Sequence, residues 1–194
     1  MKTPQKLKAV LPLLLVAFLI SNFSISAQTL SLSNSDSKLS VFGTSSLHDW
    51  EEKAEKQKGS ITIETGDTPA IKALAMEIAA ESLKSGKSGM DKNTYKALKT
   101  DKHKTITFKL SDTKSVTASG NNTYKVSATG ALTLAGVTKT IPLDFTMTVN
   151  GSTVKLTGEK SFKMSEFKID PPTAMFGTVT TGDEVKITFT SVFK

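Results

Sequence analysis

The segment Ser45-Ser46-Leu47-His48-Asp49-Trp50 holds the densest group of chemically capable side chains in the sequence. Serine, histidine and aspartate are the residue types of a hydrolase triad, in which the histidine takes the proton of the serine. His48 and Asp49 are adjacent, however, and neighbouring residues on a strand point to opposite faces. We therefore expect no catalytic residues, and we assign His48 and Asp49 to hydrogen bonds at a strand entrance and Trp50 to the core. A hydrolase that uses His48 is the alternative.

The second histidine, His103, stands between two lysines far along the chain. Two distant histidines, with no cysteine and no HxxxH or HExxH spacing, do not make a recognisable metal motif. We predict no metal site and no cofactor. A pairing of His48 with His103 in space is an open alternative.

The sequence is rich in methionine and phenylalanine, and most of these side chains are expected to fill a core. Methionine is also adaptable and is common on surfaces that accept varied apolar ligands. Phe162, Phe167, Met175 and Phe176 surround an irregular Asp170-Pro171-Pro172-Thr173 stretch. An apolar loop of this kind is a candidate lid over a pocket.

From Thr105 onward, apolar and polar residues alternate with period two, which indicates strands with one buried face. Asn150-Gly151 is a strong hairpin signal, because a type I′ turn needs positive φ at both central residues. The rows of apolar residues are Ile106 to Leu110, Tyr124 to Leu134, Ile141 to Val149, Val154 to Met164 and Val185 to Phe193.

The N-terminal half is less regular. Residues 38–42, 50–58 and 60–64 are expected strands. Residues 70–83 fit either a helix or a strand, and we choose a strand because the neighbouring segments are β-like. Residues 90–98 are expected to be a helix. The sequence therefore predicts an all-β protein of about eight strands with one or two short helices, either a sandwich or a closed antiparallel barrel. An eight-stranded barrel is just wide enough to be filled or to hold one small ligand.

Residues 1–27 have the pattern of a secretory signal peptide. Three lysines precede an apolar run from Ala9 to Ile20, and small and polar residues lead to Ala27, after which we expect cleavage. Residues 28–194 are then one domain, periplasmic or secreted. The absence of cysteine excludes a lipoprotein anchor and a disulfide framework.

All 25 basic residues are lysines. Because arginine is the side chain that reads guanine edges and grips phosphate with two hydrogen bonds, its absence argues against nucleic-acid recognition. Peripheral contact with anionic membrane surfaces is compatible with the lysines.

Several segments together, in this order and spacing, resemble the YceI family. They are Leu47 to Trp50, Ser82 to Gly86, Ser88 to Asp91, His103 with Ile106 to Phe108, Thr129 to Lys139, and Phe162 to Phe167. The resemblance covers essentially all of residues 28–194. One departure lies in the family's SDFGI-like segment, where Lys168 stands in place of glycine.

The resemblance implies a lipocalin-like antiparallel barrel, exported and non-catalytic, that holds a long isoprenoid or similar amphiphilic lipid. On this basis we expect ligand-binding roles for His48, Asp49 and His103 at the mouth and for Trp50, Met76, Met90, Phe108, Phe145 and Phe167 in the tunnel, with Phe176 in the lid. A homodimer that pairs across the open ends is compatible with this arrangement. The competing hypothesis is a structural or stress-protective envelope barrel that is filled by its own side chains.

Overall fold

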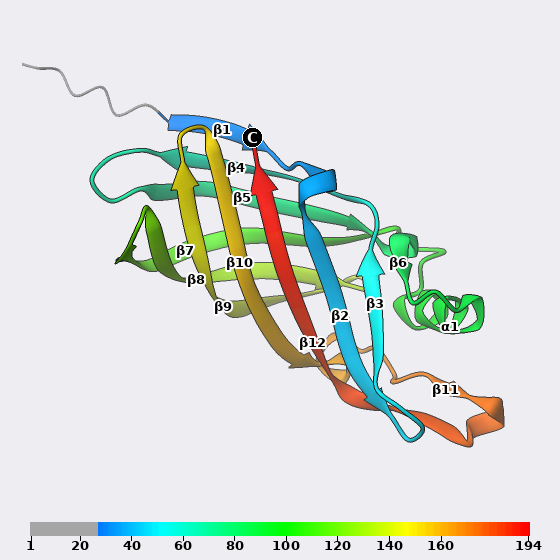
Figure 1. Cartoon of the computed structure of the whole chain (residues 1–194). Coiled ribbons are helices and arrows are strands. Elements are labelled where there is room, and N and C mark those ends of the chain that lie inside the picture. Colours follow the sequence, from blue (N-terminus) through cyan, green and yellow to red (C-terminus); the bar gives the residue numbers. More distant parts are fainter. Residues whose placement is uncertain (1–26) are drawn as a thin grey trace, which may run out of the picture.

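Strands make up most of the chain in the computed structural model, which describes residues 27–194 (Figure 1). These residues form one 12-stranded sheet and one α-helix, α1 (Ser88–Leu98). The strands are β1 (Ala27–Ser31), β2 (Lys38–Ser45), β3 (Trp50–Ala54), β4 (Gln57–Glu64), β5 (Ala70–Ala79), β6 (Leu83–Lys84), β7 (Thr105–Gly120), β8 (Thr123–Leu134), β9 (Val137–Asn150), β10 (Thr153–Lys163), β11 (Thr173–Ala174) and β12 (Val179–Phe193). The expected signal peptide, residues 1–27, lies outside the described residues except for Ala27.

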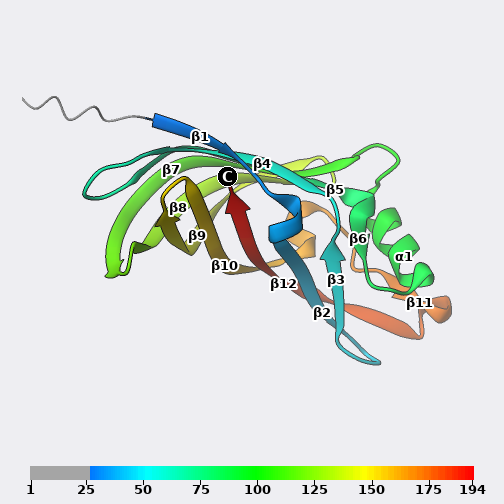
Figure 2. The same ribbon diagram turned by 45° about the horizontal axis from the view of Figure 1, so that its top comes forward.

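The sheet runs in the order β1-β4-β5-β7-β8-β9-β10-β12-β2-β3-β6, with β11 paired to β12. Every pairing is antiparallel. The sheet curls around a common interior, and α1 lies beside β6 at one end (Figure 2). The helix is short, and within residues 27–194 there is no helix of the length and apolar character that a membrane span needs.

The expectation of an eight-stranded closed barrel is wrong in two respects. The strands number more than eight, and the sheet is open, with β1 and β6 as its two ends. At one end of the molecule, Ser31 and Ser33 exchange backbone hydrogen bonds of 2.8–3.0 Å with Val192 and Lys194. The extra strands β1, β6 and β11 have five residues or fewer, too short for alternation to reveal them.

Alternation predicts the C-terminal half well. In β8 every second residue from Val126 to Leu134 is buried, and β9 buries Ile141, Leu143, Phe145 and Met147 in the same way. The hairpin between β7 and β8 has positive φ at Asn121 and Asn122, as expected of a turn. The strand prediction for residues 70–83 holds for β5, after which the 3-10 turn η2 (Ala80–Ser82) leads into β6.

The expected strand at residues 50–58 is instead two strands, β3 and β4, which separate at Glu55 and Lys56. The side chain of Asn34 spans this break. Its amide nitrogen donates to the carbonyl of Glu55 at 3.0 Å, and its amide oxygen accepts from the backbone N–H of Gln57 at 2.8 Å.

The buried side chains of the interior form two core clusters. Ile61, Met147 and Phe193 have no solvent exposure and pack in a core cluster where the end of β1 meets the end of β12. A second cluster lies toward the other end, around Phe162, Met164 and Phe167 of β10 and the 3-10 turn η3 (Met164–Phe167). The space between these clusters and α1 is hollow.

Candidate functional site

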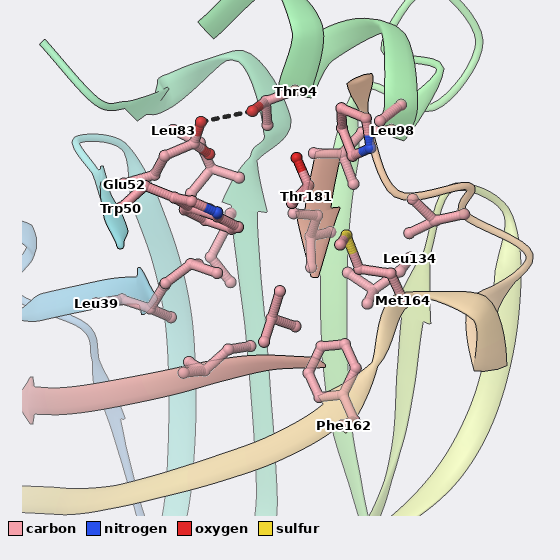
Figure 3. A pocket seen from close by; sticks show the side chains of 18 of the residues that line it. Leu39, Trp50, Glu52, Leu83, Thr94, Leu98, Leu134, Phe162, Met164 and Thr181 are labelled. Atoms are coloured by element: carbon pink, nitrogen blue, oxygen red, sulfur yellow. Dashed lines mark hydrogen bonds between the residues drawn. The ribbon is translucent and has the colours of Figure 1, made fainter. Parts of the chain in front are cut away.

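A cavity of about 510 Å³ occupies the hollow part of the interior (Figure 3). Its volume lies in the range of about 300–1,000 Å³ that is typical of ligand pockets. Most of the wall consists of Leu, Ile, Val, Met and Phe side chains from the strands, and Met90, Ala97 and Leu98 of α1 close one side. Ile61, Met147 and Phe193 are not part of the wall, so the filled core forms the floor.

Two glycines let large rings lie flat against the cavity wall. A Cβ atom at Gly130 of β8 would lie 2.2 Å from Cζ of Phe108, and one at Gly43 of β2 would lie 2.2 Å from Cζ2 of Trp50. Any larger residue at either position would push the ring away from the wall. A glycine inside a strand often marks such a close approach, so Gly43 and Gly130 could have indicated these contacts from the sequence.

The β2–β3 loop is held by its own hydrogen bonds at the mouth of the cavity. The hydroxyl of Ser45 donates to the carbonyl of His48 at 2.7 Å and accepts from the backbone N–H of His48 at 3.1 Å. Nδ1 of His48 lies 2.8 Å from the carbonyl oxygen of Asp49. The hydrogen-bonding role expected of His48 at the strand entrance is therefore present, whereas the imidazole meets a backbone carbonyl in place of a triad carboxylate.

Six of the ten predicted site residues line the cavity: His48, Trp50, Met76, Met90, Phe108 and Phe145. The other four lie elsewhere. Asp49 is exposed and is not part of the cavity wall, but it borders an adjoining groove that shares His48 and Trp50 with the cavity. Phe167 is fully buried, 5.1 Å from the ring centroid of Phe162, and it packs behind the lining.

The remaining two residues lie away from the interior. The ring of His103 packs over Gly136 in the β8–β9 turn, where an added Cβ would lie 2.4 Å from it. Phe176 is fully exposed. Among residues 27–194, no group of three or more His, Cys, Asp or Glu side chains is arranged to hold a metal ion.

The candidate lid contributes to the wall. Pro172, Thr173, Ala174 and Met175 line the cavity, and β11 pairs with Val179 and Thr180 of β12. The turn that follows, η4 (Met175–Gly177), has positive φ at Met175 and Phe176. These two side chains and Leu47 are the exposed large hydrophobic residues among residues 27–194.

One carboxyl group of the cavity wall escaped the sequence prediction. Glu52 is only 2% exposed, and it lies on the same face of β3 as Trp50. Oγ1 of Thr94 on α1 donates a hydrogen bond of 2.5 Å to Oε1 of Glu52. Burial away from water, the largest influence, raises the pKa of Glu52 to about 7. Alternation from Trp50 would have placed Glu52 inside.

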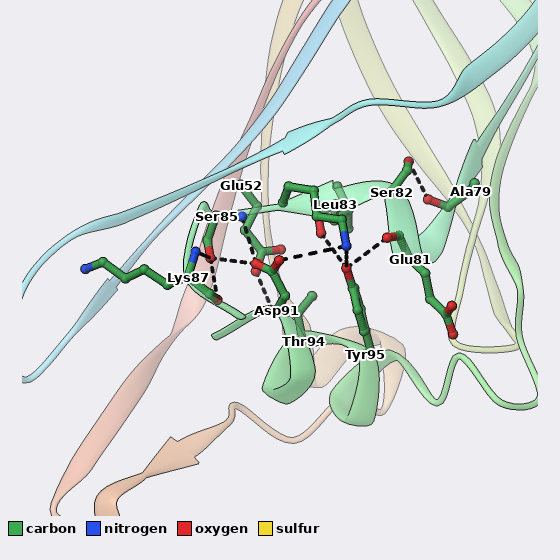
Figure 4. A network of polar contacts seen from close by, with 11 residues as sticks. Glu52, Ala79, Glu81, Ser82, Leu83, Ser85, Lys87, Asp91, Thr94 and Tyr95 are labelled. Carbon is green, nitrogen blue, oxygen red and sulfur yellow. Dashed lines mark hydrogen bonds and ion pairs between the residues drawn. The ribbon is translucent and has the colours of Figure 1, made fainter. Parts of the chain in front are cut away.

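A polar network next to Glu52 ties α1 to the sheet (Figure 4). The hydroxyl and the backbone N–H of Ser85 both donate to Oδ1 of Asp91, at 2.6 and 2.9 Å, and they hold the pKa of Asp91 below its ordinary value. Nζ of Lys84 bonds the hydroxyl of Tyr95 and lies 3.9 Å from Oδ2 of Asp91. These contacts fix the position of the helix that carries Thr94.

The sequence matches the model of the YceI-like domain over residues 24–193. The chain belongs to the YceI-like family. A search of curated proteins found no match. The YceI-like resemblance seen in the sequence is thereby confirmed.

Solved structures agree with this YceI-like assignment at the level of the fold. BcnA from Burkholderia cenocepacia is 23% identical with a TM-score of 0.65, over 83% of this chain and 98% of that one. A polyisoprenoid binding domain from Saccharophagus degradans, implicated in plant cell wall breakdown, is 11% identical with a TM-score of 0.65, over 88% and 98%. The YCEI protein of Campylobacter jejuni is 18% identical with a TM-score of 0.52, over 100% and 93%.

Proposed function

We propose that this protein is a non-catalytic carrier that holds a polyisoprenoid or similar long-chain amphiphile inside its curled sheet, for carriage or storage in the cell envelope. The observation that carries the proposal is the cavity of about 510 Å³, with an apolar wall and a filled floor. A barrel filled by its own side chains would have no such space. The polyisoprenoid binding domain of the same fold is in keeping with a ligand of this class.

The energetics of an apolar chain suit this cavity. Each methylene group moved from water into an apolar site stabilises the complex by about 0.8 kcal/mol. A long prenyl chain therefore needs few polar contacts to bind tightly, and the wall offers few. His48 and Trp50 at the mouth, with Met76, Met90, Phe108 and Phe145 deeper in, are the proposed contacts among the residues selected from the sequence.

The mouth supports binding better than catalysis. A triad needs a carboxylate on the histidine nitrogen that faces away from the nucleophile. Nδ1 of His48 lies against the carbonyl oxygen of Asp49, and Ser45 bonds the backbone of His48. We assign both residues to the shape of the mouth.

Export to the periplasm or the medium is part of the proposal, and it rests on the signal-peptide pattern of residues 1–27. We further propose peripheral contact with a membrane through the exposed side chains of Leu47, Met175 and Phe176, because Leu47 and Met175 also line the cavity and so lie at its mouth. Pairing of two copies across their open ends stays a prediction.

Blocking the cavity tests the proposal. Ala97 lines the cavity from α1, whereas its neighbour Lys96 is exposed and is not part of the wall. We expect Ala97→Phe to weaken binding of geranylgeraniol about tenfold or more, because the added ring takes space from the ligand and each methylene group displaced loses about 0.8 kcal/mol of binding free energy. Lys96→Phe is the matched control and should bind like the wild type. The fluorescence of Trp50, the sole tryptophan, reports binding.

Circular dichroism and thermal unfolding establish that both variants are folded. Equal affinity of the two folded variants would contradict the proposal, because the ligand would then bind outside the cavity.

A further inference from the structure

An ionisable side chain lies in the apolar wall, which is an expensive place for a charge. Glu52 reaches the cavity from β3, and Thr94 meets it from α1 with the hydrogen bond of 2.5 Å (Figure 3). Within residues 27–194, Thr94 is the sole hydrogen-bond donor to this carboxylate. A carboxylate has about four acceptor positions, so Glu52 retains acceptor capacity for a ligand in the cavity.

The charged groups around Glu52 do not neutralise it. Asp91 on α1 carries a charge of the same sign, and Lys84 on β6 is engaged with Asp91 and Tyr95. His48, Lys87 and Lys160 also line the cavity. In the described part of the chain, none of these side chains forms an ion pair with Glu52 within 4.0 Å.

We propose that Glu52 and Thr94 form a headgroup-selecting subsite inside the cavity, which accepts a neutral long-chain alcohol and rejects an anionic amphiphile of the same chain length. This inference rests on the proposed function and names the class of ligand. The hydroxyl of an alcohol can donate to the carboxylate of Glu52, and a hydrogen bond to an ionised acceptor is stronger than a neutral one. An anionic headgroup would instead bring a second negative charge beside Glu52 in a site of low dielectric.

The proposed subsite predicts how the affinity for an anionic ligand depends on pH. The pKa of Glu52 is about 7 without a ligand. An anionic headgroup at this subsite has to bind together with a proton on Glu52. The affinity for the anion should therefore fall by about tenfold for each pH unit above 7, because one proton is taken up on binding. The affinity for the alcohol should change far less.

Two probes of equal chain length separate the contribution of the headgroup from that of the alkyl chain. They are 1-decanol and decanesulfonate, whose sulfonate is ionised at every pH used. Their affinities for the full protein are measured between about pH 6 and about pH 9 by the fluorescence of Trp50, a range that brackets the titration of Glu52. In Glu52→Gln we expect the decanesulfonate slope to vanish and the two affinities at high pH to converge.

Glu51→Gln is the matched control. It removes one negative charge from the same strand, but Glu51 bonds Ser40 and is not part of the cavity wall. This variant should keep the wild-type slope. The slope of the wild type needs no variant and so tests the subsite even without a folded Glu52→Gln protein.

Two results would overturn the inference while leaving the carrier function standing. The first is equal binding of decanol and decanesulfonate to the wild type at high pH. The second is a decanesulfonate slope that persists in Glu52→Gln, which would show that the slope does not arise from Glu52. If the wild type binds neither probe, the proposed function fails together with this inference.

Discussion

Two phenylalanine side chains have different roles, because one lines the cavity and the other lies in the packed core. Phe108 is half-buried, and its ring lies on Gly130 at the cavity wall. Phe167 has no exposure and packs against Phe162 away from the cavity. Their residue types and their positions in the sequence gave no means of separating the two, because both were expected to line the tunnel.

Truncation should separate them. Phe167→Ala removes a tightly packed ring, and we expect it to lower the free energy of unfolding by about 3–5 kcal/mol. Phe108→Ala enlarges a space that already exists, so its loss of stability should be clearly smaller, while lipid binding weakens. Urea unfolding of both variants measures the difference. Equal losses would mean that the interior around Phe108 is filled.

The surroundings of Glu52 likewise determine its protonation. Its folded-state pKa of about 7 lies above the ordinary value of 4.5. Between these two pH values, the folded protein keeps a proton that the unfolded chain has already released. The stabilisation that this proton brings is complete below pH 4.5 and is lost as the pH rises toward 7.

Glu52→Gln should therefore be more stable than the wild type at pH 8, by about 3 kcal/mol at most, and the gain should disappear below pH 4.5. Thermal unfolding of both proteins across this range gives the comparison. A difference that does not vary with pH would show that the carboxyl of Glu52 titrates normally in the folded state.

At the scale of elements, the segment between β10 and β12 carries both cavity wall and exposed apolar surface. Pro172 to Met175 face the cavity, whereas Phe176 is fully exposed with a positive φ. A non-glycine residue in that conformation is uncommon and strained, and such strain is often found where a segment is functional. This turn, with Leu47, is the surface of the proposed membrane contact.

Replacing the exposed ring should affect membrane contact alone. Phe176→Asn introduces a residue type that tolerates positive φ, so the free energy of unfolding should stay within about 0.5 kcal/mol of the wild-type value. Cosedimentation with lipid vesicles should fall. Unchanged cosedimentation would remove this turn from the membrane contact and leave the cavity unaffected.

The elements also show how far the sequence can be interpreted. Alternation predicted β8, β9 and β10, which have one buried face, and also the segments Ile106 to Leu110 of β7 and Val185 to Phe193 of β12. At the split between β3 and β4, Gln57 bonds Asn34, which is more than twenty residues away, and a local pattern cannot show such a contact. The same limit explains why Thr94 was missed, since it becomes a site residue only through the packing of α1 against β3.

At the scale of the whole molecule, the packed core and the cavity for a ligand lie in different parts of the interior. Hydrogen bonds between Ser31 and Lys194 join the ends of the described chain over a filled core. The opposite end is left to α1, the β2–β3 loop and residues 170–177, which surround the cavity. Both buried clusters can stabilise the protein, while the cavity leaves space for a ligand.

Native mass spectrometry of the protein purified from its own host tests the central claim most directly. The account predicts a noncovalent adduct with the mass of a long-chain lipid, which is lost on denaturation and is less abundant in Ala97→Phe. A ligand-free wild-type protein that also takes up no added prenyl alcohol would contradict it.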